Sequence, residues 1–335
     1  MLVVPREAAG ARLDRFLATT LSAMEGGPSR SELQRWIEHG GVTVDGVTKK
    51  AAEKLREGAR IQVKPEAPPP TEALAEEGIE FEVVHADDDL IVIDKPPGLV
   101  VHPARGHRTG TLVNGLLALG AFDSATFEEE SEDDDEREEC DPSAIRFATE
   151  RQRPGIVHRL DKGTSGLMVV ARSVRARELL KAQFAEHSIE REYVAICVGN
   201  VKKTTFDTLH GRHPTDRLRF SSKVRSGKRA VTHVRPLETF AGGAATLVAC
   251  RLETGRTHQI RVHLADNKTP ILGDRLYGKT PKHDVLRELA EALGRPALHA
   301  RVLGFVHPAT GKKIRFEAEP PADFQVALTA LRAIP

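Results

Sequence analysis

The chain has 335 residues, of which 40% are hydrophobic, so it is long enough for two domains and can bury a sizeable core. No apolar run approaches the ~20 residues of a membrane span, and the N-terminal residues lack an uninterrupted apolar signal core. We therefore expect a soluble, cytoplasmic protein that does not bind membranes.

The formal net charge of +1 hides an uneven distribution of charge along the chain. Residues 128–141 contain eleven acidic residues and one basic residue, and the rest of the chain, with 48 basic and 37 acidic residues, carries a net charge of +11. A cationic body is expected of a protein that neutralises phosphates. Blocks of like charge repel themselves and bury nothing, so residues 122–152 are predicted to be a disordered acidic insertion.

The three cysteines, Cys140, Cys197 and Cys250, are widely spaced and form no CxxC pair. This pattern argues against a disulfide framework and against a zinc site. A reducing compartment fits this cysteine usage best.

Residues 1–64 are predicted to form a domain of their own. A helix-like pattern begins at Arg12, residues 29–37 have the pattern of a capped helix, and residues 41–46 have that of a strand ending in a turn. This segment resembles the alpha-L RNA-binding fold of a small-subunit ribosomal protein and of many RNA-modifying enzymes. It matches the motif SRSxLQxWIxxGxVxVxG, although Gly58-Ala59-Arg60 departs from the usual Gly-Asp.

The resemblance implies that basic side chains of this domain contact RNA phosphates. The candidates are Arg30, Arg35, Lys49, Lys50 and Lys54. The alternative is that they are ordinary charges on a helical surface.

Residues 65–78 come next as a proline-rich linker, which favours an extended chain over helix or sheet. Beyond it, strand-like patterns occur at residues 81–85, 90–94, 193–198, 231–237, 246–252 and 314–319, and helix-like patterns at 111–119 and 174–186. Runs of strands with few helices predict an α+β fold with a mainly antiparallel mixed sheet, here over residues 79–326.

The segment GIVHRLDKGTSGLMVVAR, residues 155–172, places one carboxylate between cationic side chains. Apolar residues 155–157 lead into it, and the strand-like run 167–171 comes after a segment of turn composition, so Asp161 is expected where a strand opens into a loop. Arg159 and Lys162 favour the ionised carboxylate, which keeps it available as a nucleophile or base. On local sequence alone, a buried Asp that caps the turn is an equal alternative.

The same segment resembles the catalytic signature HRLDxxTSG of the RluA/RluD-type pseudouridine synthases, matched from His158 to Gly166. Further motifs occur in the family's order over about residues 79–325: DKPPG at 94–98, VHP at 101–103, REY at 191–193, LETGRTHQIRVH at 252–263, LHA at 298–300 and HP at 307–308. The resemblance implies an RNA uridine isomerase that uses no cofactor or metal.

In such an enzyme Asp161 is the catalytic carboxylate, which attacks C1′ or removes the 2′ proton after the uridine has been flipped into a pocket. By resemblance, Arg261 pairs with Asp161, and Tyr193 packs against the uracil. Arg191 stands where the family has Lys. Arg159 fills the gap left by the flipped nucleotide or, alternatively, binds phosphate. The two-domain arrangement favours large-subunit ribosomal RNA, or a ribosomal subunit precursor, as the partner of a monomeric enzyme.

Several rival functions fit parts of the sequence. The main one is an RNA-binding or ribosome-assembly factor whose catalytic site is vestigial. For the acidic insertion, the alternative to a disordered segment without a function is a flap that competes with RNA for the basic face of the protein. Residues 273–280 fit the letters of a phosphate-binding P-loop, but no buried strand precedes them, and Pro281 stands where the helix of a P-loop should begin. The spacing of His258 and His263 suits no zinc site. A glycosidase would need a second acid near Asp161, where the pattern offers arginine.

Overall fold

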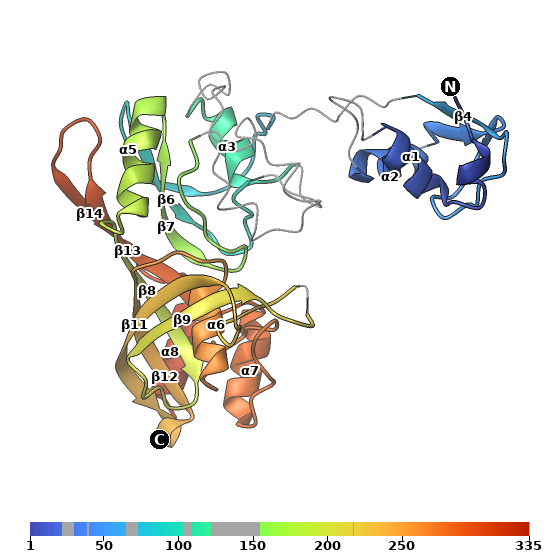
Figure 1. Cartoon of the computed structure of the whole chain (residues 1–335). Coiled ribbons are helices and arrows are strands. Elements are labelled where there is room, and N and C mark those ends of the chain that lie inside the picture. The colour runs from blue at the N-terminus through green and yellow to red at the C-terminus, as the bar shows by residue number, and fades with distance from the viewer. Residues whose placement is uncertain are drawn as a thin grey trace. The chain divides into compact units, whose positions relative to one another are not determined.

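The computed structural model describes residues 1–21, 30–38, 40–64, 73–102, 109–121, 155–216 and 218–334. The predicted acidic insertion lies outside these residues. The chain divides into two compact units, Met1–Pro70 and Thr71–Pro335 (Figure 1). Among the described residues, no helix is both long and apolar enough to cross a membrane.

The first unit packs two helices against a small antiparallel sheet. The helices are α1 (Leu13–Leu21) and α2 (Arg30–Glu38), a 3-10 turn lies at Arg6–Ala8, and the strands β1 (Leu2–Val3), β2 (Val42–Val44), β3 (Val47–Thr48) and β4 (Arg60–Val63) pair in the order β1-β4-β2-β3. Leu13, Phe16 and Leu17 are buried on α1 because their spacing places them on one face. They pack with Trp36 and Ile61 in one core.

The second unit is built on a ten-stranded sheet. Its strands are β5 (Glu82–Ala86), β6 (Leu90–Lys95), β7 (Ser165–Ala171), β8 (Glu190–Val198), β9 (Thr205–Arg212), β10 (Phe220–Ser221), β11 (Lys228–Phe240), β12 (Ala245–Leu252), β13 (Leu298–Val306) and β14 (Lys313–Glu317). The order is β10-β9-β11-β12-β8-β13-β7-β6-β5, with β14 paired to β13. The β13–β7 pair is parallel and the other pairs are antiparallel, so the predicted mainly antiparallel mixed sheet is confirmed.

Helices cover both faces of this sheet. They are α3 (Leu112–Ala118), α5 (Val174–Ala185), α6 (Gln259–Asp266), α7 (Asp284–Leu293) and α8 (Ala322–Arg332), with a 3-10 turn at Ala241–Gly243. Leu90 and Val92 of β6 share one core cluster with residues of α5, whereas Ile91 and Ile93 share another with residues of α3. Because both faces are buried, β6 and β7 are continuous apolar runs with no alternation.

The second unit extends beyond the range predicted from the sequence at both ends. The Leu74 carbonyl accepts from the Asn114 amide at 2.7 Å, and the Glu76 N–H donates to the Asn114 carbonyl at 3.0 Å, so this part of the predicted linker is attached to the larger unit. At the other end, α8 continues past residue 326, and Phe324 and Leu331 are fully buried in the main core.

The segment before the Asp161 loop also differs from expectation. Residues 155–157 contribute one isolated bridge, Ile156 to Val170, so no strand leads into the Asp161 loop. Residues 273–280 do not form a P-loop, because only turns and coil lie between them and the start of α7 at Asp284.

Candidate active site

Asp161 lies in an irregular loop that is fixed at several points before β7 begins. Gly155 has a φ of +69°, and a Cβ there would lie 2.1 Å from the Ala171 carbonyl oxygen, so this close approach requires glycine. The Lys162 carbonyl accepts from the Gly98 N–H at 2.7 Å. The fully buried Lys95 ammonium donates to the same carbonyl at 3.4 Å and to two carbonyls of its own turn. The loop thus presents the Asp161 side chain from a constrained main chain.

Arg261 joins the Asp161 loop to α6. Its Nη1 donates to Asp161 Oδ2 at 2.9 Å, while its Nε and Nη2 donate to the two carboxylate oxygens of Asp274 at 2.8 and 3.0 Å. Asp274 is itself fixed by the N–H groups of Leu276 and Tyr277. The bidentate contact with Asp274 therefore orients the guanidinium so that its Nη1 points at the Asp161 carboxylate.

The sequence motif that looked like a P-loop has a different part in this arrangement, because Asp274 lies within it. Its carboxylate accepts two hydrogen bonds from Arg261 and fixes the orientation of that guanidinium. No feature of the sequence alone pointed to this contact.

The charges around Asp161 favour its ionised form. Burial opposes ionisation, but the positive charges of His258, Arg261 and Arg159, together with the Arg261 hydrogen bond, hold the pKa of Asp161 below its ordinary value. Burial lowers the pKa of His258, so Arg261 is the main cation beside Asp161 at neutral pH. Asp161 is a carboxylate that stays charged although it is largely enclosed.

His258 is a residue of this site that the histidine spacing in the sequence did not indicate. Its Nε2 lies 3.8 Å from Asp161 Oδ2, and its Nδ1 hydrogen-bonds the Tyr277 hydroxyl at 2.8 Å. The backbone of His258 is left-handed, with φ of +58°, directly before α6. That unusual conformation turns the imidazole toward the Asp161 loop, whereas His263 points into the core and contacts Thr208 and Thr232.

The predicted pocket residues Arg159, Tyr193 and Arg261 line a cavity of about 460 Å³ together with Asp161. Leu252, Ile260 and Leu298 add apolar wall. Tyr193 is buried on β8, and burial together with the charge of Asp161 raises the pKa of its hydroxyl, which stays protonated at neutral pH. Arg159 is exposed, so its guanidinium is free to meet a ligand at the cavity wall.

The predicted RNA contacts of the first unit are only partly described. Lys49, Lys50 and Lys54 are exposed, and Lys49 lies 3.5 Å from Glu53. The side chains of Arg30 and Arg35 lie outside the described part of the molecule. The exposed lysines are available to a polyanion, and they belong to a different unit from the Asp161 cavity.

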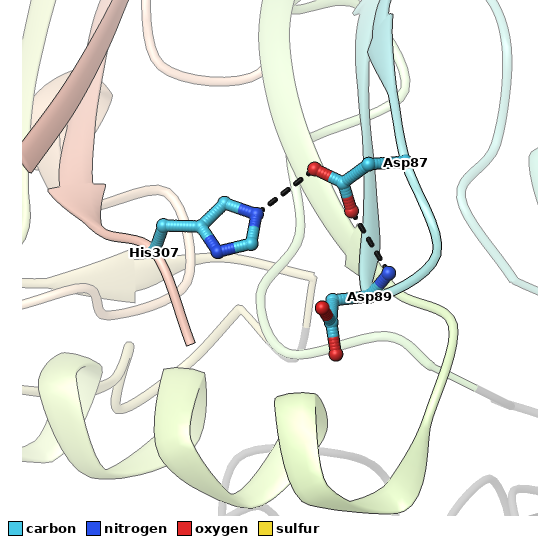
Figure 2. Close-up of side chains that lie close together, drawn as sticks. All are labelled: Asp87, Asp89 and His307. Atoms are coloured by element: carbon cyan, nitrogen blue, oxygen red, sulfur yellow. Dashed lines mark hydrogen bonds and ion pairs between the residues drawn. The ribbon is translucent and has the colours of Figure 1, made fainter. Parts of the chain in front are cut away.

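A second cluster of titratable groups lies at the turn between β5 and β6, where Asp87, Asp89 and His307 place metal-ligand-type atoms within 4.8 Å of one another (Figure 2). His307 Nδ1 accepts from two backbone N–H groups, so Nε2 carries the proton and donates to Asp87 at 2.9 Å. His85 Nε2 contacts the same oxygen at 2.8 Å. These hydrogen bonds explain the cluster as a link between the β5–β6 turn and the end of β13.

Two family models and several known proteins are similar to this chain in sequence. A family model described as RNA pseudouridylate synthase matches residues 89–266, and a model of the S4 domain matches residues 12–61. Ribosomal large subunit pseudouridine synthase D of Xanthomonas campestris is 43% identical, covering 98% of this chain and 92% of that protein. The protein of the same name from Neisseria meningitidis serogroup A is 41% identical, covering 99% and 81%.

Among solved structures, human RNA pseudouridylate synthase domain containing 4 is similar in fold, with a TM-score of 0.53 and 24% identity over 75% of this chain and 93% of that one. The family expected from the HRLD segment and the later motifs is thereby confirmed. The chain belongs to the RNA pseudouridylate synthase family, carries an S4 RNA-binding domain at its N-terminal end, and is an RNA pseudouridine synthase.

Proposed function

We propose that this enzyme isomerises uridine to pseudouridine in large-subunit ribosomal RNA, with Asp161 as the catalytic carboxylate. The observation that carries the proposal is the contact between Asp161 and Arg261, 2.9 Å long, at a cavity wall. It supplies an ionised carboxylate in a partly enclosed site, where a charged group acts with little competition from water.

The isomerisation breaks the N1–C1′ bond, turns the uracil, and joins its C5 to C1′, after which C5 loses its hydrogen as a proton and N1 ends with one. Asp161 starts the reaction either by attacking C1′ or by removing the 2′ proton, and in both routes it must be ionised beforehand. Arg261 keeps it ionised and oriented, because the guanidinium is itself fixed by Asp274.

The cavity accepts a single nucleotide that has left its stack. Asp161 and the buried Tyr193 face a space lined by Leu252, Ile260 and Leu298, which a base inside a helix could not enter. The Tyr193 ring packs against the flipped uracil. Arg159 stacks or hydrogen-bonds in the gap left in the RNA, or else contacts a phosphate there.

The proposed RNA target rests on the two relatives, both named as large-subunit enzymes, and on the S4 domain. Lys49, Lys50 and Lys54 on that domain, with Arg30 and Arg35, supply contacts to phosphates that do not depend on base sequence. The enzyme is proposed to act as a monomer. Mapping pseudouridines in cells with and without the gene identifies the modified uridine.

The catalytic assignment is tested by tritium release from C5 of [5-³H]uridine in a large-subunit rRNA transcript. Wild-type enzyme is expected to release tritium, and Asp161→Asn, which keeps the shape of the side chain but not its charge, is expected to release none. Equal release by both proteins would reject Asp161. RNA binding without release by wild-type protein would instead favour a ribosome-assembly factor with a vestigial site.

A further inference from the structure

Arg191 is a buried cation in the wall of the active-site cavity. It is 7% exposed, and it lies two residues before Tyr193 on β8, so both side chains point to the same face of the strand. Both line the cavity that contains Asp161. The pseudouridine synthase chemistry described above gives Arg191 no task.

The surroundings of Arg191 do not neutralise its charge. The buried arginines among the described residues are Arg177, Arg191, Arg261 and Arg295. Three of them donate to a carboxylate, at 2.9 Å for Arg177, 2.8 Å for Arg261 and 2.6 Å for Arg295. Arg191 instead donates to the Glu253 carbonyl oxygen at 2.9 Å, and its Nε is buried without a hydrogen-bond partner. A buried charge of this kind is costly unless an anion joins it.

The neighbours of the Arg191 guanidinium at the cavity wall are an aromatic ring and a glycine. The Arg191 guanidinium carbon lies 5.4 Å from the centre of the Phe184 ring, which supports it from one side. Gly255 faces Nη1, and a Cβ at that position would lie only 2.9 Å from it. Gly255 and Arg256 also line the cavity, so a side chain larger than glycine at position 255 would crowd Nη1, and Arg256 adds a second cation to the same lining.

We propose that Arg191 binds a backbone phosphate of the RNA, next to the uridine held by Tyr193 and Asp161. This inference rests on the proposed function and adds a phosphate subsite to it. A phosphodiester supplies the full negative charge that the site lacks, whereas a uracil carbonyl would supply only a neutral acceptor.

The experiment compares Arg191→Met, which removes the charge and keeps an apolar side chain of similar length, with Arg191→Lys, which keeps the charge. The value of kcat/KM is measured by tritium release from the rRNA transcript over a range of salt concentrations. We expect kcat/KM of Arg191→Met to fall about tenfold to a hundredfold. The slope of log kcat/KM against log salt should become shallower by about 0.7, the value for one single-strand phosphate contact.

Arg191→Lys and the surface variant Arg332→Gln are the matched controls, and both should keep the wild-type slope; Arg332 pairs with Glu238 at the surface of α8, outside the cavity lining. The melting temperature of Arg191→Met should equal or exceed that of wild type, because an uncompensated buried charge has been removed. Wild-type release together with an unchanged slope in Arg191→Met would overturn the phosphate subsite alone. Absence of release by wild-type enzyme would overturn the proposed function as well.

Discussion

Arg261→Gln tests whether the Arg261 contact is what keeps Asp161 ionised. The substitution removes the positive charge and the 2.9 Å hydrogen bond to Asp161 Oδ2. A charge-assisted hydrogen bond contributes about 1.5–3 kcal/mol, which corresponds to about one to two pKa units. Since the folded-state pKa of Asp161 is lowered, activity is present above that pKa and lost as pH falls through it. In Arg261→Gln the pKa rises, so the acid limb should move to higher pH by about one to two units.

The assay is the pH dependence of kcat/KM from tritium release, for wild type, Arg261→Gln and Arg159→Gln. Arg159 is exposed, and its charge is a weaker influence on Asp161 than that of Arg261, so its removal should move the acid limb less. Coincident acid limbs for Arg261→Gln and wild type would refute the reasoning. A larger displacement in Arg159→Gln than in Arg261→Gln would refute it equally.

The same substitution has a consequence for folding that separates loss of charge from loss of structure. Asp274 is 4% exposed and would lose the cation that its two oxygens face. Breaking a buried pair in this way costs about 3–5 kcal/mol. In Arg261→Gln/Asp274→Asn the uncompensated charge is gone, so thermal unfolding should occur at a higher temperature than in Arg261→Gln. Equal melting temperatures would show that Asp274 does not depend on Arg261 for its burial.

The remaining predictions concern positions whose surroundings are defined by short contacts. Gly166→Ala should destabilise the protein by more than about 3 kcal/mol in urea titrations, because its Cβ would lie 2.3 Å from the Ala300 carbonyl oxygen, whereas Gly311→Ala, also at positive φ but in open space, should cost about 1–2 kcal/mol. Burial raises the pKa of Asp87, but hydrogen bonds from two histidines and two backbone N–H groups outweigh burial, so its folded-state pKa is lowered. The ionised carboxylate therefore stabilises the fold at pH values above its unfolded-state pKa, and this stabilisation is lost as the pH falls through the folded-state pKa. Asp87→Asn should lack this stabilisation, so wild type should lose more stability than the variant on acidification. Tyr193→Phe should keep most of kcat/KM, while Tyr193→Leu should lose about 1–3 kcal/mol of transition-state stabilisation.

Elements with a strong local pattern could be predicted from the sequence. The apolar runs of β6 and β7 and the helix α5 lie close to their expected ranges. Ser173 is the N-cap of α5, where its side chain accepts from the Ala176 N–H at 3.2 Å. Local composition determines these elements because their residues are consecutive in the chain.

The segment around Arg261 shows why a periodic pattern can mislead. Ile260, Val262 and Leu264 alternate with polar residues, yet residues 259–266 form α6. Arg261 and His263 are buried there too, because each has polar partners inside the protein. Alternation of apolar and polar residues therefore does not report exposure when the polar side chains are enclosed.

Contacts between residues far apart in the chain could not be predicted from local sequence patterns. Asp161 and Arg261 are 100 residues apart, and their pairing could be expected only through family resemblance. Residues 298–306 stood out only as a short motif, yet β13 is a central strand between β8 and β7. The roles of His258 and Asp274 depend on which loop each one faces, which composition and spacing do not determine.

The position and the charge of Asp161 are controlled by different parts of the molecule. The main chain directly after Asp161 is fixed by two hydrogen bonds: Lys95 donates to the Lys162 carbonyl, and Arg295 donates to the Gly163 carbonyl at 3.2 Å. Its ionised form is favoured by nearby positive charges, among which Arg261 of α6 also hydrogen-bonds the carboxylate. Lys95 and Arg295 contact backbone carbonyls, so the loss of either side chain should displace Asp161 without removing its counter-ion. Arg261 contacts the carboxylate itself, so its loss should change the pKa of Asp161 while the loop is still held in place. The partly buried carboxylate can therefore remain ionised in a fixed position, which is the combination that the proposed reaction at a flipped uridine requires.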